Sequence, residues 1–312
     1  MFNEKFFFTA TKEDEKIRLD KWLVSKFPKH SRNYFQYLID NQYITVNNSP
    51  IKKRMLLKEG DQIAIFFEPL PEITLEPENI PLDILYEDEH LLIINKPANL
   101  VVHPAPGHPK STFVNALLFH CENLEAKDNI RPGIVHRLDK ETSGVLIAAK
   151  TTKAHQQLIE QFAARQIKKI YIAICLGNLK NITVSQPIAR HPTKRKEMTI
   201  IETGKEAITD FACLTHNETY CVVLARPLTG RTHQIRVHLK HLKTPVLGDQ
   251  IYGSNKTNKQ LKIPRTLLHC YQMTFIHPIS NQPLCISAPL PQEMLEWIQK
   301  INRDFSLSLV LS

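Results

Sequence analysis

The sequence predicts an α+β protein, with a large C-terminal domain on a mixed, mostly antiparallel sheet and a small N-terminal α/β domain. Short apolar segments of strand length alternate with segments of helical periodicity along most of the 312 residues. Residues 207–226 have the pattern of a hairpin that turns at 216–219, which implies antiparallel pairing rather than a doubly wound sheet. An acidic stretch with several prolines separates two basic regions. We therefore expect two domains of unequal size.

The N-terminal domain is expected to contain two short helices and a small sheet. Apolar residues recur at helical spacing just before Pro28, and a serine that can cap a helix follows it. The predicted elements are a helix over 18–26, a second helix after Ser31, and strands over 43–46 and 62–67 with a turn at Asn47-Asn48.

Residues 69–89 carry seven acids, no base and four prolines, a composition typical of an extended, self-repelling connector. The expected organisation is thus a domain over 1–68, a linker over 69–89 and a second domain over 90–312. In the second domain we expect strands near 91–95, 134–135, 145–149, 170–176, 207–215 and 219–226, with helices near 111–120, 153–165 and 232–241.

Positive charge is concentrated in two places. Residues 18–58 hold nine bases against two acids, and residues 131–240 hold 18 bases against eight acids. Two basic regions joined by an acidic linker favour a polyanionic partner, and nucleic acid is the one best matched, because neutralising phosphates releases counterions. The alternative is that lysines and arginines simply solvate the surface.

Several classes of protein are disfavoured by the sequence. No apolar run approaches the roughly 20 residues that span a bilayer, and the start of the chain lacks a secretory signal pattern, so cytoplasmic residence without membrane attachment is expected. The six cysteines are scattered and are expected to be reduced. His233, His238 and His241 do not have the spacing of a zinc hydrolase, so no metal is expected. We expect the chain to act as a monomer.

A charged loop followed by a buried strand has the pattern of a catalytic loop. The loop contains His136, Arg137, Asp139 and Lys140, and it leads into the apolar segment 145–149. Asp139 would be ionised at neutral pH, but burial under a ligand would favour its protonated form. It therefore needs a cationic partner, which could come from Arg137, Lys140, Arg231 or Arg236.

The sequence resembles the RluA-type pseudouridine synthases of the large-subunit ribosomal RNA kind, preceded by an S4 RNA-binding domain. The resemblance rests on His136-Arg137-Leu138-Asp139-Lys140, on Gly230-Arg231-Thr232-His233-Gln234-Ile235-Arg236, and on an S4-like order of residues from Arg18-Leu19-Asp20-Lys21 to Gly60-Asp61. Asn99 stands where the family often has glycine, so a positive φ is expected there.

The resemblance implies that the chain isomerises uridine to pseudouridine with Asp139 as nucleophile, Arg236 as its salt-bridge partner and Tyr171 stacked on the target uracil. It implies no cofactor. Attack on ribose C1′, addition to uracil C6 and assistance in losing the C2′ proton all remain open for Asp139. Arg137 is the candidate for filling the space that the extruded base leaves.

Phosphate contacts must offset the energy needed to flip the base. They are expected in the cleft and on the N-terminal domain, from Lys140, Arg231, Arg18, Lys21, Arg32, Lys52 and Lys53, and from the turn 194–196, which alternatively is only solvated. Large-subunit ribosomal RNA is the expected substrate. The alternatives are the same chemistry on tRNA, or an RNA-binding ribosome-assembly factor without catalysis in which Asp139 is structural and Tyr171 belongs to the core. A glycosidase would need a second carboxylate beside Asp139, and Glu141 alone is close in sequence.

Overall fold

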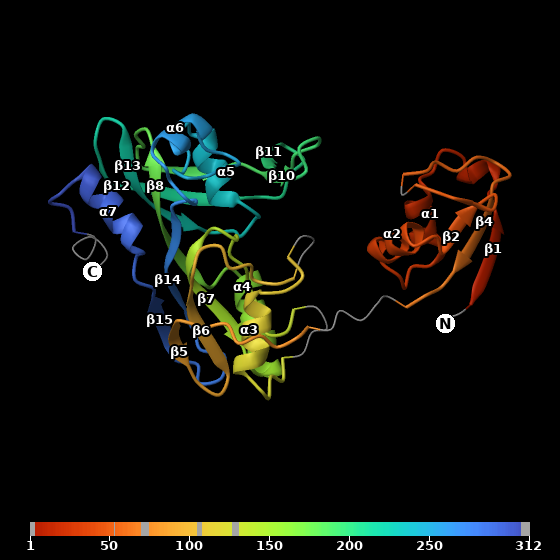
Figure 1. Ribbon diagram of the computed structural model, residues 1–312, viewed down its shortest axis with the longest axis horizontal. Helices are drawn as coiled ribbons and strands as arrows, with labels where there is room; N and C mark the ends of the chain where they lie inside the picture. Colours follow the sequence, from red (N-terminus) through yellow and green to blue (C-terminus); the bar gives the residue numbers. More distant parts are fainter. Residues whose placement is uncertain (1–3, 53, 70–74, 105–107, 127–130, 307–312) are drawn as a thin grey trace. The chain divides into compact units, whose positions relative to one another are not determined.

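The computed structural model describes residues 4–52, 54–69, 75–104, 108–126 and 131–306. The chain divides into two compact units, Met1–Thr74 and Leu75–Ser312 (Figure 1). One hydrophobic cluster lies wholly in the first unit, and three lie wholly in the second. Each unit therefore has its own core.

In the N-terminal unit two helices pack on a four-stranded antiparallel sheet in the order β1-β4-β2-β3. Its elements are β1 (Lys5–Thr9), the 3-10 helix η1 (Lys12–Asp14), α1 (Leu19–Lys26), α2 (Arg32–Asp40), β2 (Ile44–Val46), β3 (Ser49–Pro50) and β4 (Gln62–Phe66). The predicted cap is present, because the Ser31 hydroxyl accepts a hydrogen bond from the Tyr34 amide at 3.2 Å. Asn47 and Asn48 form the predicted turn with φ of 51° and 59°. Strand β1 was not predicted.

The C-terminal unit is built on a nine-stranded sheet in the order β5-β6-β7-β14-β8-β13-β12-β9, with β15 paired to β14 (Figure 1). Its strands are β5 (Ile84–Glu87), β6 (Leu91–Lys96), β7 (Ser143–Ala149), β8 (Lys168–Leu176), β9 (Ile182–Ser185), β12 (Ile208–His216), β13 (Tyr220–Pro227), β14 (Leu268–Ile276) and β15 (Pro283–Ser287). All pairs are antiparallel except β7 with β14. The predicted mixed, mostly antiparallel sheet is thus confirmed. Strands β10 (Ile188–Arg190) and β11 (Met198–Ile200) form a separate hairpin.

The two faces of this sheet carry different cores. Alternate residues of β8 point to opposite sides, so Tyr171 and Ala173 join the cluster that contains α3 (Phe113–His120), α4 (Thr152–Ala163) and α5 (Gln234–His241). Ile172 and Ile174 instead pack with α7 (Gln292–Ile301) on the opposite face. Apolar residues that follow the short helix α6 (Asn255–Gln260) in sequence belong to the same cluster. Tyr171 thereby faces the side of the sheet on which α5 lies.

The segment 82–87, inside the predicted linker, belongs to the folded C-terminal unit. Leu82, Leu85 and Tyr86 pack against its core, and β5 pairs with β6. The acids do not repel one another as expected, because they find partners: Asp83 accepts from the Asn95 amide, and Glu87 pairs with Lys150. The prediction of an unpacked connector was therefore wrong for these residues.

Two further differences concern strands. The strand predicted at 134–135 is a single bridge between Ile134 and Ala148. Strand β14 was missed, although it lies in the middle of the sheet. Gly144 makes the β7–β14 contact possible: it has a φ of 110°, and a Cβ there would lie 2.2 Å from the Cys270 carbonyl oxygen. This contact fixes the start of β7, the strand that follows the Asp139 loop in sequence.

Among the described residues, no helix combines the length and the apolar character that crossing a membrane requires.

Candidate active site

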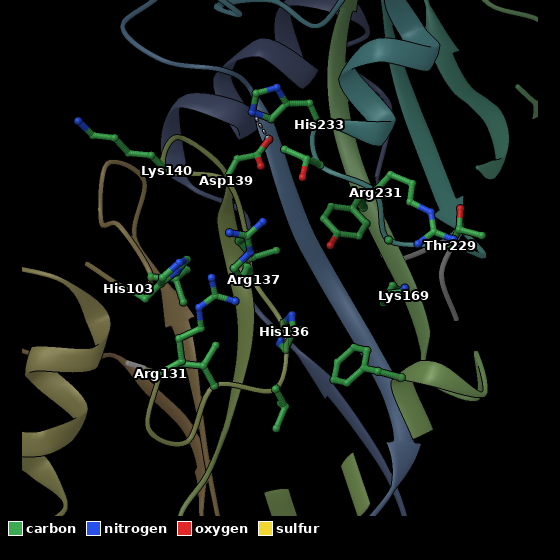
Figure 2. Close-up of a pocket in the computed structure, with 18 of the residues that line it drawn as sticks. His103, Arg131, His136, Arg137, Asp139, Lys140, Lys169, Thr229, Arg231 and His233 are labelled. Atoms are coloured by element: carbon green, nitrogen blue, oxygen red, sulfur yellow. Dashed lines mark ion pairs between the residues drawn. The ribbon is translucent and has the colours of Figure 1, made fainter. Parts of the chain in front are cut away.

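A cleft of about 750 Å³ opens on the sheet face that Tyr171 occupies. Four segments distant in the sequence line it, 101–103, 131–140, 162–171 and 228–233. Figure 2 shows His103, Arg131 and Arg137 on one side and Lys169, Thr229 and Arg231 on the other. A smaller pocket of about 100 Å³ adjoins it and extends to Arg236.

The cleft is strongly cationic. Its lining includes six arginines and lysines, Arg131, Arg137, Lys140, Arg165, Lys169 and Arg231. Asp139 is the one acid among the described residues that line it. Such a cleft attracts a polyanion. Asp139 is the carboxylate that a ligand bound in the cleft would meet.

Asp139 is held by an arginine that has a second, fully buried carboxylate as its anchor. Arg236 on α5 donates from Nη1 to Asp139 Oδ2 at 2.8 Å. Its Nε and Nη2 donate to the two oxygens of Asp249, at 2.7 and 2.9 Å. Asp249 is fully buried, while the Asp139 side chain keeps 26% of its exposure. The predicted ion pair is therefore present, and its arginine cannot swing away from the site.

This arrangement keeps Arg236 charged. Burial alone would lower the pKa of the guanidinium, but hydrogen bonds and the charges of Asp249 and Asp139 raise it above its usual value. Burial would likewise raise the pKa of Asp249, and the hydrogen bonds from Arg236 and from the amides of Ile251 and Tyr252 lower it instead. Asp139 thus has a permanent cation beside it in a partly dry pocket.

Tyr171 lines the same cleft as Asp139. It lines both pockets and is 9% exposed. Burial, with contributions from Cys270 and Asp139, raises the pKa of its phenol well above the usual value, so the ring stays neutral. A neutral aromatic ring and an anchored carboxylate at one cationic cleft form a site suited to a nucleobase.

Comparisons with known proteins agree with this geometry. The RNA pseudouridylate synthase profile matches residues 90–241, and the S4 domain profile matches residues 17–63. Ribosomal large subunit pseudouridine synthase D of Escherichia coli K12 is 40% identical over 311 residues, covering 95% of both chains. The chain belongs to the RluA-type RNA pseudouridine synthases.

Two further relatives agree. An uncharacterized RNA pseudouridine synthase of Synechocystis is 42% identical over 282 residues, covering 88% of this chain and 86% of that one. The solved structure of human RNA pseudouridylate synthase domain containing 4 aligns with a TM-score of 0.56 at 26% identity, over 70% of this chain and 92% of that one. The chain is thus an isomerase that acts on RNA, with an N-terminal S4 domain.

Lys96 supports the loop that carries Asp139, a role that the sequence did not suggest. It is fully buried, and its Nζ donates to the carbonyl oxygens of Pro97, Leu100 and Lys140, at 2.7, 3.0 and 3.1 Å. Burial lowers the pKa of Lys96 to about 7, and the charge of Asp139 partly opposes this. The neighbouring Asn99 has the predicted positive φ, 69°, and its amide also donates to Lys140 O. The signal in the sequence that could have identified Lys96 was a lysine at the end of an apolar strand, directly before a proline.

Lys169 is a second residue that sequence reasoning missed. It lines both pockets, and burial lowers the pKa of its ammonium. It precedes Tyr171 by two residues on β8, so strand alternation places both on the cleft side. The strand pattern around Tyr171 was the signal that could have identified it.

His136 ties its loop to the neighbouring strand β7 and to α4. Its Nε2 accepts a hydrogen bond from the Ile147 amide at 2.9 Å, and its ring stacks on Phe162. Burial lowers the pKa of His136 to about 3, which leaves the ring neutral and unsuited to deliver protons. His269 is similar: it pairs with Ser143, and burial lowers its pKa to about 4.

We expect these two histidines to make the synthase sensitive to acid. In the unfolded chain both rings take up protons near pH 6.5, whereas the folded state resists protonation until about pH 4 or below. Below pH 6.5 the unfolded state thus binds more protons than the folded state. The free energy of unfolding therefore decreases as the pH is lowered. Each ring contributes about 1.4 kcal/mol per pH unit between pH 6 and pH 4.5. Chemical denaturation at several pH values measures this slope. The His136→Gln variant should have the shallower slope, and equal slopes for variant and wild type would contradict the assignment.

The other predicted RNA contacts in the catalytic unit differ in placement. Arg137 and Arg231 line both pockets, and Arg231 Nε donates to the Glu206 carbonyl oxygen at 2.8 Å. The Lys140 side chain extends away from Asp139 in Figure 2. Its Nζ lies 3.4 Å from His108 Nε2. Lys140 is thus placed at the edge of the site rather than against the carboxylate.

In the S4 domain two of the predicted contact residues share one buried carboxylate. Asp20 is fully buried and accepts from Arg18 Nη2 at 2.9 Å and from Arg32 Nη2 at 2.6 Å. Burial would raise the pKa of Asp20, but these hydrogen bonds lower it. Lys21 and Lys52 are exposed. Lys53 lies outside the described residues.

His238, one of the three histidines weighed as metal ligands, is held by hydrogen bonds within the protein. His238 is buried between Thr209 and the Gln186 carbonyl. Within the described ranges, no group of three or more histidine, cysteine or acidic side chains is placed to hold a metal ion. All six cysteines are free thiols.

Proposed function

We propose that this synthase isomerises specific uridines in large-subunit ribosomal RNA, with Asp139 as the nucleophile. The observation that supports the residue most strongly is that the one described acid lining the cationic cleft is paired with a buried, anchored arginine. The substrate class is supported by the E. coli relative, which carries the name of a ribosomal large subunit synthase and aligns over 95% of both chains.

In this proposal the isomerisation needs the Asp139 carboxylate and no second reactant. The C1′–N1 bond breaks, the uracil rotates, a C1′–C5 bond forms, and the proton on C5 leaves while N1 gains one. Product and substrate are isomers, so atoms and electrons balance without a redox or group-transfer partner, and we propose that no cofactor takes part. Attack on C1′, addition to C6 and assistance in C2′ proton loss each need an anionic oxygen close to the nucleotide, and Asp139 provides it.

The residues around Asp139 take complementary roles in this proposal. Tyr171 stacks on the target uracil, and its neutral, buried phenol serves as an acid or base in removing the proton on C5. Arg236 is the ion-pair partner of the carboxylate and holds its Oδ2. Arg137, which alternates with Asp139 along the loop and lines both pockets, fills the space that the flipped base leaves.

Phosphate contacts are assigned to both units. The S4 domain contributes Arg18, Lys21, Arg32, Lys52 and Lys53, and the catalytic unit contributes Lys140, Arg231 and the exposed turn 194–196. We further propose that the protein works as a monomer in the cytoplasm, where it reaches RNA in ribosomal particles.

The S4 domain should contribute most to the salt dependence of RNA binding. We expect removal of residues 1–68 to weaken binding and to flatten the plot of log affinity against log salt, because fewer counterions are released. The double variant Lys21→Gln/Lys52→Gln keeps the domain folded and should reduce the slope by about 1.5. Filter binding at several salt concentrations measures both. If the truncated protein had the same salt dependence as wild type, the S4 domain would not contribute phosphate contacts.

Pseudouridine mapping tests the substrate assignment. RNA is compared from cells with the gene, without it, and with the Asp139→Asn variant. We expect a small set of pseudouridines in large-subunit ribosomal RNA to vanish in the second and third strains. Loss of sites in tRNA instead would move the substrate to tRNA. If every site persisted without the gene, another synthase would make them and the ribosomal assignment would fail.

A further inference from the structure

His233 stands between Asp139 and a buried tyrosine at the start of α5. Its backbone is left-handed, with a φ of 57°. Residues other than glycine adopt this conformation seldom, and at functional sites it is retained when the surroundings fix it. Here it turns the ring back toward the carboxylate: Figure 2 shows His233 directly beside Asp139.

The hydrogen bonds of Tyr252 determine which ring nitrogen of His233 carries the proton. Tyr252 is 4% exposed. Its hydroxyl oxygen accepts from the Met198 amide at 2.7 Å and lies 2.8 Å from His233 Nδ1. A buried hydroxyl needs an acceptor for its own proton, and Nδ1 is the acceptor within reach among the described residues. The phenol therefore donates to Nδ1, and the proton of neutral His233 sits on Nε2.

That Nε2–H points at the oxygen that Arg236 already holds. His233 Nε2 lies 3.9 Å from Asp139 Oδ2, the oxygen that accepts from Arg236 Nη1 at 2.8 Å. The distance exceeds a hydrogen bond, but contacts at catalytic sites commonly shorten when ligand binds. In the described part of the chain, no group donates to Oδ1. Arg236 Nη1 and His233 Nε2 thus both face Oδ2, and Oδ1 has no donor among the described residues.

The charge state of His233 suits this role. Burial, together with the charges of Arg236 and Arg137, lowers the pKa of the ring, and Asp139 opposes them only in part. A neutral donor can orient a carboxylate without adding a second cation beside Arg236. A further positive charge would bind the carboxylate more tightly and make it a weaker nucleophile.

We propose that His233 is a positioning residue for the isomerisation: Tyr252 holds it in the Nε2–H tautomer, and its Nε2–H fixes Asp139 Oδ2 so that Oδ1 reacts. This deepens the proposed function and rests on Asp139 being the nucleophile. Hydrogen bonds run from the Met198 amide through Tyr252 to His233, whose Nε2 lies 3.9 Å from the carboxylate.

The kinetic test compares His233→Leu, His233→Gln and Tyr252→Phe with wild type, on large-subunit ribosomal RNA from cells that lack the gene. Misplacement of a reacting group by about 1 Å can cost about 100-fold in rate, so His233→Leu should lose 10- to 100-fold in kcat with KM nearly unchanged. Gln places an amide N–H close to where His has Nε2, so His233→Gln should recover most of the rate. Tyr252→Phe should fall between them. His216→Leu, an exposed histidine at the end of β12, is the control for loss of a histidine.

A direct readout of the tautomer keeps the proposal separate from folding effects. The ¹⁵N spectrum of the histidine side chains in the RNA-free enzyme, assigned by the signals that His233→Gln removes, should show Nδ1 of His233 unprotonated at pH 7 and protonated in Tyr252→Phe. A protonated Nδ1 in wild type, or wild-type kcat in a folded His233→Leu, would overturn the proposal. If wild type leaves this RNA unmodified, the ribosomal substrate is wrong, and the spectrum still decides the tautomer.

Discussion

Arg236→Ala should make no pseudouridine and should lower the free energy of unfolding by about 3–5 kcal/mol, the usual effect of breaking a buried ion pair by removing one partner. The loss is large because Asp249 is fully buried and, among the described residues, would keep only the amides of Ile251 and Tyr252 as donors. Asp139 would lose its ion-pair partner. Denaturant titration and analysis of product nucleosides measure the two effects.

Two companion variants of Arg236 separate stability from catalysis. Arg236→Lys keeps the charge but has no planar fork, so it can satisfy Asp249 or Asp139 but not both; we expect partial loss of each property. Arg236→Met/Asp249→Leu replaces the buried pair with apolar side chains, which is often neutral for stability. This double variant should be folded and inactive. An active double variant would show that Asp139 does not need the guanidinium.

Asp139→Asn should bind RNA at least as well as wild type and lose activity by about 10³-fold or more, the scale seen when a covalent nucleophile is removed. The amide is nearly isosteric and its oxygen can still accept from Arg236, so the fold should persist. Removal of the one described acid that lines a cationic cleft can only favour a polyanion. Binding measurements and nucleoside analysis on the same preparation test both halves.

Asp139→Glu is the matched control for position. It keeps the charge but moves the oxygens by one methylene, about the misplacement that costs 100-fold. Its activity should therefore lie between those of wild type and Asp139→Asn. Equal activity of all three proteins would remove Asp139 from the chemistry.

Local patterns in the sequence were sufficient for many elements. The helix before Pro28, the cap at Ser31, the Asn47-Asn48 turn and the hairpin that became β12 and β13 are set by neighbours in the chain. Strand β14 was missed because its place in the centre of the sheet depends on contacts with β7 and β8, far away in sequence. The strand β5 was masked by acids whose partners, Asn95 and Lys150, lie in other elements.

The candidate site shows the same division. The need for a cation beside Asp139 follows from placing a carboxylate under a ligand, but the choice of Arg236, 97 residues away, came from the family resemblance. The second carboxylate could not be predicted, since nothing near Asp249 in sequence indicates that it anchors Arg236 from the other side. Nor does the sequence show that the buried ammonium of Lys96 caps the carbonyls of the catalytic loop. Buried polar groups are explained by their tertiary partners, and those appear only in the fold.

Tritium release from RNA that carries 5-tritiated uridine follows the isomerisation most directly, because the new bond to ribose displaces the hydrogen on C5. With enzyme in excess over RNA, wild type should release the tritium of each target uridine in one phase. Asp139→Asn, bound to the same RNA, should release none. Release by that variant at the wild-type rate would mean that another group attacks the nucleotide, and that the anchored carboxylate in the cleft has a different purpose.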